Sequence, residues 1–232
     1  MSKLDPEIGW YYDKGGEAAR LTESSFLEEA RTRRIIARRL GDGPKAIADI
    51  GAGPGAYSVW LAGLGHEVHV LDPVERHVRE AQEAADAAGV RLSSCHEGRA
   101  ENLPYLDAEM DAALLLGPLY HLTRREDRVA ALREARRVVR PDGPVFAAAI
   151  SRYASAMDGF FRDYVREETF AASMQRTLRD GQHRNPDRHD GFFTTAYFHK
   201  ADELRYELRD AGFRDVELLA IEGPFTSIPD LN

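Results

Sequence analysis

A group of glycines follows the first strongly apolar run of the chain, residues 46–50, and an aspartate ends the second run, residues 68–71. The glycines alternate along the loop and are Gly51, Gly53 and Gly55. Without a Cβ they let the backbone turn sharply off a strand and approach a ligand closely. The aspartate, Asp72, lies about 20 residues on, a spacing from which an acid accepts hydrogen bonds from ribose hydroxyls. This strand-loop-helix-strand pattern predicts a site for an adenosine-containing ligand.

The glycine loop suits two classes of ligand, and its neighbours distinguish them. Gly51 to Ala56 satisfies the G-x-G-x-x-A dinucleotide fingerprint, which favours a nicotinamide cofactor. Asp49, two residues before the first glycine, would instead attract a cationic ligand group and repel a pyrophosphate. Pro54-Gly55 favours a tight loop over a helix N-terminus open to phosphate, and the sequence has no Tyr-x-x-x-Lys pair for short-chain dehydrogenase chemistry. Together these features favour an adenosine ligand without phosphate.

Two stretches resemble the class I S-adenosylmethionine-dependent methyltransferases. D-I-G-A-G-P-G, residues 49–55, is similar to the first motif of that family, and LLLGPLYHL…R..AL.EARRVVRPDG, within residues 114–143, is a second, independent similarity. The resemblance implies S-adenosylmethionine as cofactor, S-adenosylhomocysteine as product and methyl transfer to an O, N or C atom of a small-molecule acceptor. In that family the amino group of the ligand is cationic and there is no phosphate, which suits Asp49.

The resemblance also implies which residues contact the cofactor. Residues 98–104, G-R-A-E-N-L-P, are similar to a segment that reads the adenine edge with an acid and a backbone N–H. Arg99 stands where the acid is usual and could stack its planar guanidinium on the ring, while Ala100 supplies the N–H. His77 is placed against the adenine; the alternative is an exposed helix histidine. The full expected set is Asp49, Gly51, Gly53, Gly55, Asp72, Pro73, His77, Arg99, Ala100, Leu116, Tyr11 and Arg20.

An aromatic segment near the N-terminus has two interpretations. Tyr11, Tyr12, Glu17, Arg20 and Leu21 resemble an arm that folds over the cofactor in many small-molecule methyltransferases. The alternative is that these aromatic side chains only pack on the domain.

Methyl transfer depends mainly on alignment of donor and acceptor, and a base is needed only where the acceptor loses a proton. His121, just beyond the fourth predicted strand, is the best-placed base because its pKa range suits proton transfer. The alternative is a structural histidine bonded to the backbone. Tyr120 and His199 are weaker catalytic candidates, and we expect Tyr120 to shape the acceptor pocket. His183 and His189 are six residues apart, without convincing metal-ligand spacing, so no metal is expected.

Periodicity predicts an α/β protein with a Rossmann-like, doubly wound, mostly parallel sheet and helices on both faces. The expected strands are residues 46–50, 68–71, 90–95, 111–116, 145–150 and 216–221. The expected helices are residues 24–40, 74–88, one that begins in a capping box over 123–126, and 201–211.

Four segments follow from these elements. They are an N-terminal arm and helix (1–43), the S-adenosylmethionine-binding core (44–150), an aromatic-rich insertion with helices of its own (151–200), and the C-terminal completion of the core (201–232). The family resemblance implies that the insertion covers the acceptor. The family's sheet ends in a strand hairpin, but only residues 222–232 follow the sixth predicted strand. We therefore expect the last strand to be missing here and the natural chain to be longer.

Composition limits the partners. The net charge of −8, from 31 basic and 39 acidic residues, argues against nucleic acid and anionic membranes. Cys95 is the only cysteine, which suits a reducing compartment, and the N-terminus MSKLDPEIGW has no apolar signal core. We expect a cytoplasmic monomer or homodimer that acts in small-molecule metabolism. Two alternatives stay open: an NAD(P)-dependent oxidoreductase, and an inactive protein that binds S-adenosylmethionine.

Overall fold

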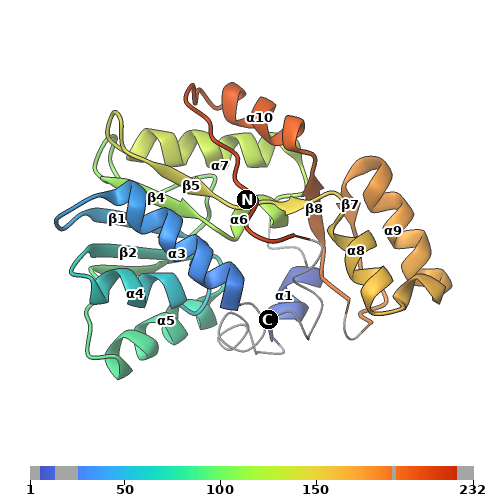
Figure 1. Ribbon diagram of the computed structural model, residues 1–232. Helices are drawn as coiled ribbons and strands as arrows, with labels where there is room; N and C mark the ends of the chain where they lie inside the picture. The colour runs from blue at the N-terminus through green and yellow to red at the C-terminus, as the bar shows by residue number, and fades with distance from the viewer. Residues whose placement is uncertain (1–5, 14–25, 190–191, 224–232) are drawn as a thin grey trace.

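Five parallel strands form the central sheet, in the order β3-β2-β1-β4-β5 (Figure 1). This computed structural model describes residues 6–13, 26–189 and 192–223. The strands are β1 (Ala46–Ile50), β2 (Glu67–Asp72), β3 (Ser94–Glu97), β4 (Ala112–Leu115) and β5 (Val145–Ala147). Asp49 pairs in register with Val70 on one side and Leu114 on the other. The C-terminal ends of β1, β2 and β4 therefore lie along one edge of the sheet, here called the carboxyl edge.

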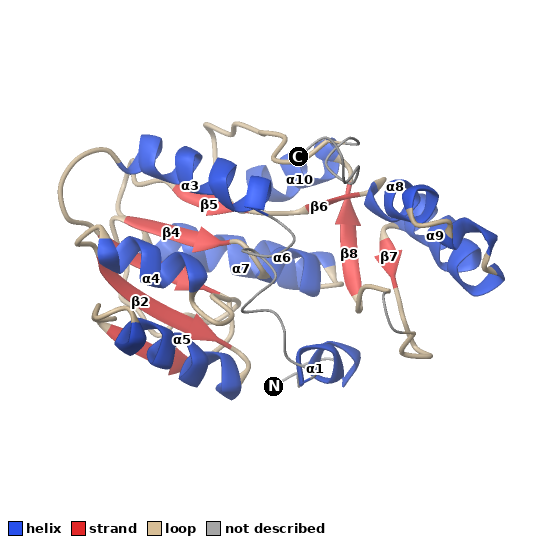
Figure 2. Ribbon diagram, turned by 60° about the horizontal axis from the view of Figure 1, so that its bottom comes forward, coloured by secondary structure: helices blue, strands red, loops and turns tan. Residues whose placement is uncertain are grey.

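Helices cover both faces of the sheet, as the alternating pattern predicts (Figure 2). On one face lie α3 (Phe26–Leu40), α4 (Ala56–Gly63) and α5 (Glu75–Ala87); on the other lie α7 (Arg125–Val138) and α10 (Ala201–Asp210). Successive residues of β1 supply the two cores, with Ile47 toward α3, α4 and α5, and Ala48 and Ile50 toward α7 and α10. Strands covered on both faces are apolar along their length, which explains the continuous runs in the sequence. The doubly wound, Rossmann-like fold is confirmed.

The chain between β5 and α10 builds a small unit beyond the carboxyl edge. Its elements are β6 (Ile150–Ser151), α8 (Ala154–Phe161), the 3₁₀ turn η1 (Tyr164–Arg166), α9 (Glu168–Asp180), β7 (Gln182–His183) and β8 (Ala196–His199). Its three strands pair in the order β6-β8-β7, and Figure 2 shows β8 standing across the ends of the central strands. The helices expected within residues 151–200 are present.

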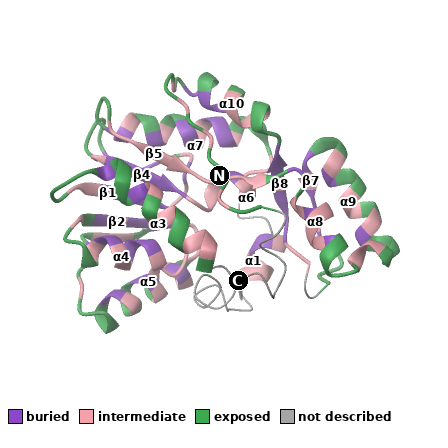
Figure 3. Cartoon of the chain, in the orientation of Figure 1, coloured by how far each residue is buried: buried purple, intermediate pink, exposed green. Residues whose placement is uncertain are grey.

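Two short helices, α1 (Pro6–Asp13) and α6 (Pro118–His121), lie at this edge near β8 (Figure 1). The helix α6 is a single turn in the segment that was expected to be a loop after β4. β8 is largely buried, whereas exposed residues lie along the outer sides of α9 and α10 (Figure 3). The junction between the sheet and the small unit is where the predicted site residues gather.

The predicted strand over residues 145–150 is wrong as a single element. Of residues 145–150, only those of β5 pair in the central sheet, with β4. Ile150 pairs instead with Phe198 of β8 in the second sheet. An apolar run does not reveal which partner strand each part of it will meet, because strand pairing is non-local. The chain therefore leaves the central sheet after Ala147.

The predicted sixth strand over residues 216–221 is also wrong, since the structure assigns no regular element there. Val216 and Leu218 pack on the core that α7 and α10 cover, which accounts for their alternation without a strand ladder. A side chain of α3 replaces a neighbouring strand as a hydrogen-bond donor: Arg31 Nη2 donates to the Ala220 carbonyl at 2.9 Å.

Two local boundaries also differ from the prediction. The third strand begins at Ser94 rather than Val90. Leu92 packs in the core beneath α5 without being part of the strand. The predicted capping box at the start of α7 is wrong: Arg124 is the N-cap residue and makes no side-chain cap bond. Glu126 accepts a hydrogen bond from Arg124 Nε at 2.7 Å instead of bonding the backbone of a cap.

Candidate functional site

The glycine loop connects β1 to α4 and fits tightly on two sides. A Cβ built on Gly51 would lie 2.6 Å from Pro118 Cγ, and one built on Gly55 would lie 2.8 Å from the Cβ of Ala81. Both contacts are closer than real Cβ atoms allow, so these positions hold the loop against α6 and α5. Gly53 differs, because a Cβ there would meet no atom of the described residues within 4 Å. Its φ of +57° still favours glycine, and its outer side leaves room for a ligand.

Asp72, at the end of β2, is buried and held by three donors. The Gly53 amide donates to Oδ2 at 2.8 Å, and the Val74 amide donates to Oδ1 at 2.9 Å. His77 Nδ1 lies 3.1 Å from the same Oδ1. Pro73, half-buried, carries the chain from Asp72 into α5. These bonds fix the carboxylate beside the glycine loop before any ligand arrives.

His77 is buried, so the alternative of an exposed helix histidine is wrong. Because a carboxylate only accepts, His77 Nδ1 carries the proton that points to Asp72. Within the described residues, the buried Nε2 of the same ring has no hydrogen-bond partner. Buried polar atoms normally have one, so an orphan ring nitrogen beside Asp72 marks a place for a polar atom of a ligand. The adenosyl group carries amino, hydroxyl and ring-nitrogen atoms of this kind, and the residues present therefore fit the expected cofactor.

Asp49 lies one strand away from Asp72 and is 2% exposed. Its Oδ2 accepts a hydrogen bond of 2.6 Å from the Ser58 hydroxyl. Burial raises the pKa of Asp49 to about 6, against the lowering effect of the Ser58 bond and with a smaller contribution from the Asp72 charge. A carboxyl group desolvated to this degree gains from a cationic partner and repels an anionic one. The environment of Asp49 fits an ammonium group and disfavours a pyrophosphate.

Three further residues of the expected cofactor set, Arg99, Ala100 and Leu116, follow β3 and β4 at the same edge. Ala100 is buried in the core, and Leu116 packs against the core on the opposite face of the sheet. Arg99 Nη2 lies 2.5 Å from Glu101 Oε1 and makes an ion pair with it. The stacking role of Arg99 therefore competes with an existing partner and stays a prediction. Arg20, the other arginine of the expected set, lies outside the described residues.

His121 lies at the end of α6 and has a partner on each ring nitrogen. Nδ1 is 3.3 Å from the Thr195 carbonyl oxygen, and Nε2 is 2.7 Å from the Tyr12 hydroxyl. Burial lowers the pKa of His121 to about 4, so the imidazole is neutral near pH 7. The bond to the Thr195 carbonyl is the backbone contact that the structural alternative for His121 predicts, so both interpretations of this histidine stay open here. The sequence carries no signal for Thr195 itself. It predicts Tyr12 only as part of the arm.

Aromatic rings surround His121. Tyr120 meets it at 4.7 Å between ring centroids, and Phe193 lies 5.9 Å away with the planes only 27° apart. Tyr11 packs edge-on against Tyr12 at 5.3 Å and against Phe193 at 5.5 Å. The structure thus brings Tyr11, Tyr12, Tyr120, His121 and Phe193 into one aromatic cluster, which joins the arm, α6 and the small unit.

The helix α1 bridges the central domain and the small unit. Glu7 accepts a hydrogen bond from the Thr195 hydroxyl and one of 3.3 Å from the Asn185 amide. At its other end, Arg76 of α5 donates to the Tyr12 carbonyl. These contacts hold α1 over the edge that carries Asp72 and His121.

The remaining clusters do not resemble a metal centre. No group of three His, Cys, Asp or Glu side chains that could hold a metal was found within the part of the chain that the structure describes. His183 hydrogen-bonds the Ser155 hydroxyl at 3.2 Å and the Phe193 carbonyl at 3.3 Å, and His189 packs on Phe192. No described helix is long and apolar enough to cross a membrane.

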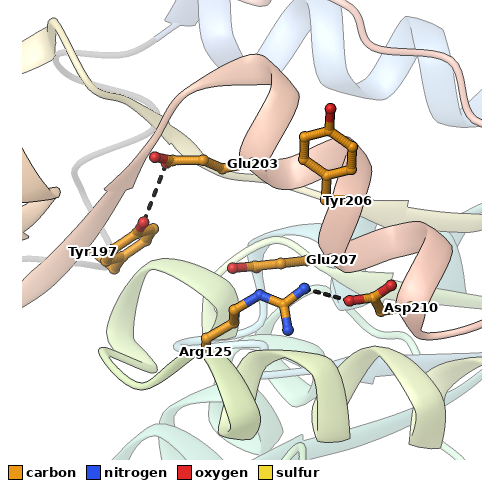
Figure 4. A pocket seen from close by; sticks show the side chains of 6 residues that line it. All are labelled: Arg125, Tyr197, Glu203, Tyr206, Glu207 and Asp210. Atoms are coloured by element: carbon orange, nitrogen blue, oxygen red, sulfur yellow. Dashed lines mark hydrogen bonds and ion pairs between the residues drawn. The ribbon is translucent and has the colours of Figure 1, made fainter.

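A separate hollow of about 360 Å³ lies between α7, α10 and β8 (Figure 4). Its carboxylates are paired: Asp210 with Arg125, Glu203 with the Tyr197 hydroxyl, and Glu207 with the buried Arg128. These pairs fasten α10 to α7 and β8, and we assign the hollow a structural role.

Comparison with known proteins gives a consistent result. A family model described as a methyltransferase domain matches residues 47–143. The ubiquinone biosynthesis O-methyltransferase of Azorhizobium caulinodans is 29% identical over 230 residues, which span 94% of this chain and 81% of that protein. A protein of the same description from Aromatoleum aromaticum is 27% identical over 215 residues, 90% of this chain and 83% of its own length.

Among solved structures, the 1,6-didemethyltoxoflavin-N1-methyltransferase of Burkholderia thailandensis is similar in fold. The TM-score is 0.60 at 21% identity, over 91% of this chain and 76% of that one. That structure holds S-adenosylhomocysteine and 1,6-didemethyltoxoflavin. At this identity the likeness establishes the fold alone.

Proposed function

We propose that this chain, which belongs to the class I S-adenosylmethionine-dependent methyltransferases, methylates a hydroxyl group on a small aromatic acceptor. S-adenosylmethionine is the cofactor, and it supplies an activated methyl group bound to a sulfonium. The observation that carries the choice of acceptor is His121, a buried neutral imidazole within an aromatic cluster at the carboxyl edge. A hydroxyl acceptor must lose a proton, and in this proposal the His121 imidazole of the aromatic cluster takes it.

The surroundings of His121 support an aromatic acceptor. Tyr120, Phe193 and Tyr11 offer ring edges and faces against which a planar molecule stacks favourably. Two relatives that align with most of this chain are described as O-methyltransferases of ubiquinone biosynthesis. In this proposal His121 is the base and Tyr120 shapes the acceptor pocket.

The cofactor contacts in this proposal follow the buried groups. Asp49 meets the ammonium of the methionine moiety, and Asp72 accepts from the ribose hydroxyls. His77 Nε2, the orphan ring nitrogen, pairs with a polar atom of the adenosyl group. The same edge is lined by the loop glycines, Pro73, Ala100 and Leu116. Arg99 contacts the adenine ring when its ion pair with Glu101 is broken.

The four segments have distinct roles in this proposal. The core (44–150) binds the cofactor, and the N-terminal arm (1–43), which includes Tyr11 and Arg20, folds over it. The insertion (151–200) covers the acceptor. Residues 201–232 complete the core. The docking of α1 between core and insertion supports this division. A lone half-buried cysteine is consistent with the cytoplasm, where we place the protein as a monomer or homodimer in small-molecule metabolism.

Neither alternative function gains support. The relatives above are methyltransferases, and the environment of Asp49 disfavours the pyrophosphate of a nicotinamide cofactor. The two relatives are described as enzymes, which gives no support to an inactive cofactor-binding protein.

Two measurements test the proposal. Calorimetric titration should show micromolar binding of S-adenosylhomocysteine and none of NADH, with binding lost in Asp72→Ala. Release of S-adenosylhomocysteine should then be followed with 4-hexylcatechol and with 4-hexylaniline as acceptors. We expect turnover with the catechol only and its loss in His121→Ala, whereas His96→Ala, which removes an exposed histidine, should behave as wild type. Turnover with the aniline alone would contradict O-methyl transfer.

A further inference from the structure

The hydrogen bond between Tyr12 and His121 has a fixed direction. The Thr195 carbonyl can only accept, so the His121 Nδ1 that faces it carries the imidazole proton. Nε2 is then an acceptor, and the Tyr12 hydroxyl donates to it at 2.7 Å. A phenol oxygen that donates its proton in this way can itself accept from another hydroxyl. The Tyr12 oxygen is therefore oriented to receive a proton on one side and to deliver one on the other.

Tyr12 lies between the two halves of the site. Its ring meets His77 edge-on at 5.1 Å and His121 edge-on at 5.4 Å. His77 bonds Asp72 on the cofactor side, and His121 belongs to the proposed acceptor side. Because the phenol covers Nε2, an acceptor hydroxyl reaches the base only through the Tyr12 oxygen or by displacing it.

We propose that Tyr12 is a second catalytic residue, which relays the acceptor's proton to His121; this inference rests on the proposed O-methyl transfer. The acceptor hydroxyl donates a hydrogen bond to the Tyr12 oxygen. When the acceptor oxygen bonds the methyl carbon, the donor's sulfur–carbon bond breaks and sulfur keeps the electron pair. The acceptor's proton moves to Tyr12 as the phenol proton moves to His121 Nε2. The products are a methyl ether, a neutral Tyr12 and an imidazolium that returns its proton to solvent.

A relay avoids a separate charged tyrosine. Phenols ionise near pH 10, so a free tyrosinate would be scarce near pH 7. Coupling both transfers places the new charge on the imidazole. Burial opposes that charge most strongly, the Thr195 carbonyl and the Asp72 carboxylate favour it, and the neighbouring His77 opposes it.

The contacts of α1 keep the relay aligned. Thr195 accepts from His121 through its carbonyl and donates to Glu7 through its hydroxyl, so one residue orients both the base and the helix that carries Tyr12. The Arg76 bond to the Tyr12 carbonyl fixes the end of that helix. The fit of α1 is therefore part of the catalytic geometry, and does more than cover the cofactor.

Steady-state kinetics of Tyr12→Phe with S-adenosylmethionine and 4-hexylcatechol test the relay. We expect kcat to fall about 100-fold, in the range lost with a general acid–base group, with the Kd for S-adenosylhomocysteine unchanged. The residual rate should rise about tenfold per pH unit, as ionisation of the acceptor replaces the relay. The double variant Tyr12→Phe/His121→Ala should lose no more than the worse single variant. Tyr206→Phe, at a tyrosine 59% exposed on α10, is the matched control and should retain wild-type kcat.

The possible failures are separable. A Tyr12→Phe enzyme with wild-type kcat, or a double variant in which the two losses multiply, would overturn the relay and leave O-methyl transfer in place. Failure of wild-type protein to methylate any hydroxyl would overturn the proposed function itself. An independent readout is the ¹⁵N NMR spectrum of His121 in the ligand-free protein. It should show the Nδ1–H tautomer and a shift of the Nε2 signal in Tyr12→Phe, and an Nε2–H tautomer would overturn the relay for every acceptor.

Discussion

Replacing Asp49 with asparagine should stabilise the ligand-free protein while removing most of its cofactor affinity. Burial is the main reason that the pKa of Asp49 rises from 3.8 to about 6; the Ser58 bond opposes the rise and the Asp72 charge adds to it. This difference corresponds to about 3 kcal/mol, at about 1.4 kcal/mol per pKa unit. Asparagine has nearly the same shape, carries no charge and can still accept from Ser58.

The sign follows from proton linkage. Between pH 3.8 and about 6 the folded state holds the Asp49 proton more tightly than the unfolded state, so the free energy of unfolding falls as pH rises. The cost is absent below this range and complete above it. Asp49→Asn should therefore raise the free energy of unfolding by up to about 3 kcal/mol at pH 8, or Tm by about 6 °C or more in a chain of this size. At pH 4 it should change little.

Urea unfolding at several pH values and calorimetric titration with S-adenosylhomocysteine measure the two effects. Because Asp49 must ionise to meet the ligand ammonium, wild-type affinity should weaken about tenfold from pH 7 to pH 5. The variant should bind at least about 100-fold more weakly, with no such pH dependence, because it leaves a buried ammonium unpaired. Asp107→Asn, at an exposed carboxylate, is the control. An Asp49→Asn protein that is less stable at pH 8, or that binds like wild type, would refute the reasoning.

Three further predictions concern the loop and the core. Gly51→Ala should destabilise the protein by about 1–3 kcal/mol more than Gly53→Ala in urea unfolding, because both positions have positive φ but only the first directs a Cβ into Pro118. Glu207→Ala should lower the free energy of unfolding by about 3–5 kcal/mol, because it leaves the buried Arg128 guanidinium unpaired. The control is Asp210→Ala, whose ion pair is exposed and whose loss of stability should be small. A loss in Glu207→Ala no larger than in this control would contradict the prediction. Burial lowers the pKa of His183 to about 4, so the unfolded state takes up that proton first and stability should fall between pH 6.5 and 4. His183→Gln should flatten this part of a pH series of unfolding curves.

The sequence predicts the first half of the core well because the relevant signals are local. The glycines require positive φ, and the runs around them are buried on both faces, so the strand-loop-helix-strand unit follows from residues 46–72 alone. The edge of the sheet was harder to predict. Whether residues 145–150 and 216–221 form strands depends on distant partners, and there β8 and α3 replaced the expected neighbours.

The candidate site shows the same division. Asp49, Asp72 and His77 lie within one local unit, and their burial follows from the ends of β1 and β2. The partners of His121 lie far from it in the sequence: Tyr12 is 109 residues away and Thr195 is 74 residues away. A hydrogen bond across such distances needs the packing of α1 and of the small unit, which no local pattern specifies.

The two perturbed groups of the site place different demands on pH. In the proposed function Asp49 must be ionised to bind the cofactor, which requires a pH above about 6 in the free enzyme. His121 must be neutral to accept a proton, which requires only a pH above about 4. Since kcat/KM reports the free enzyme and kcat the complex, the acid limb of kcat/KM for S-adenosylmethionine should reflect Asp49. The acid limb of kcat should lie lower, because the bound ammonium keeps Asp49 ionised and leaves His121 as the group that titrates. If both limbs coincide near pH 6, the ammonium does not pair with Asp49, and the carboxyl group that limits binding must be sought elsewhere at the carboxyl edge.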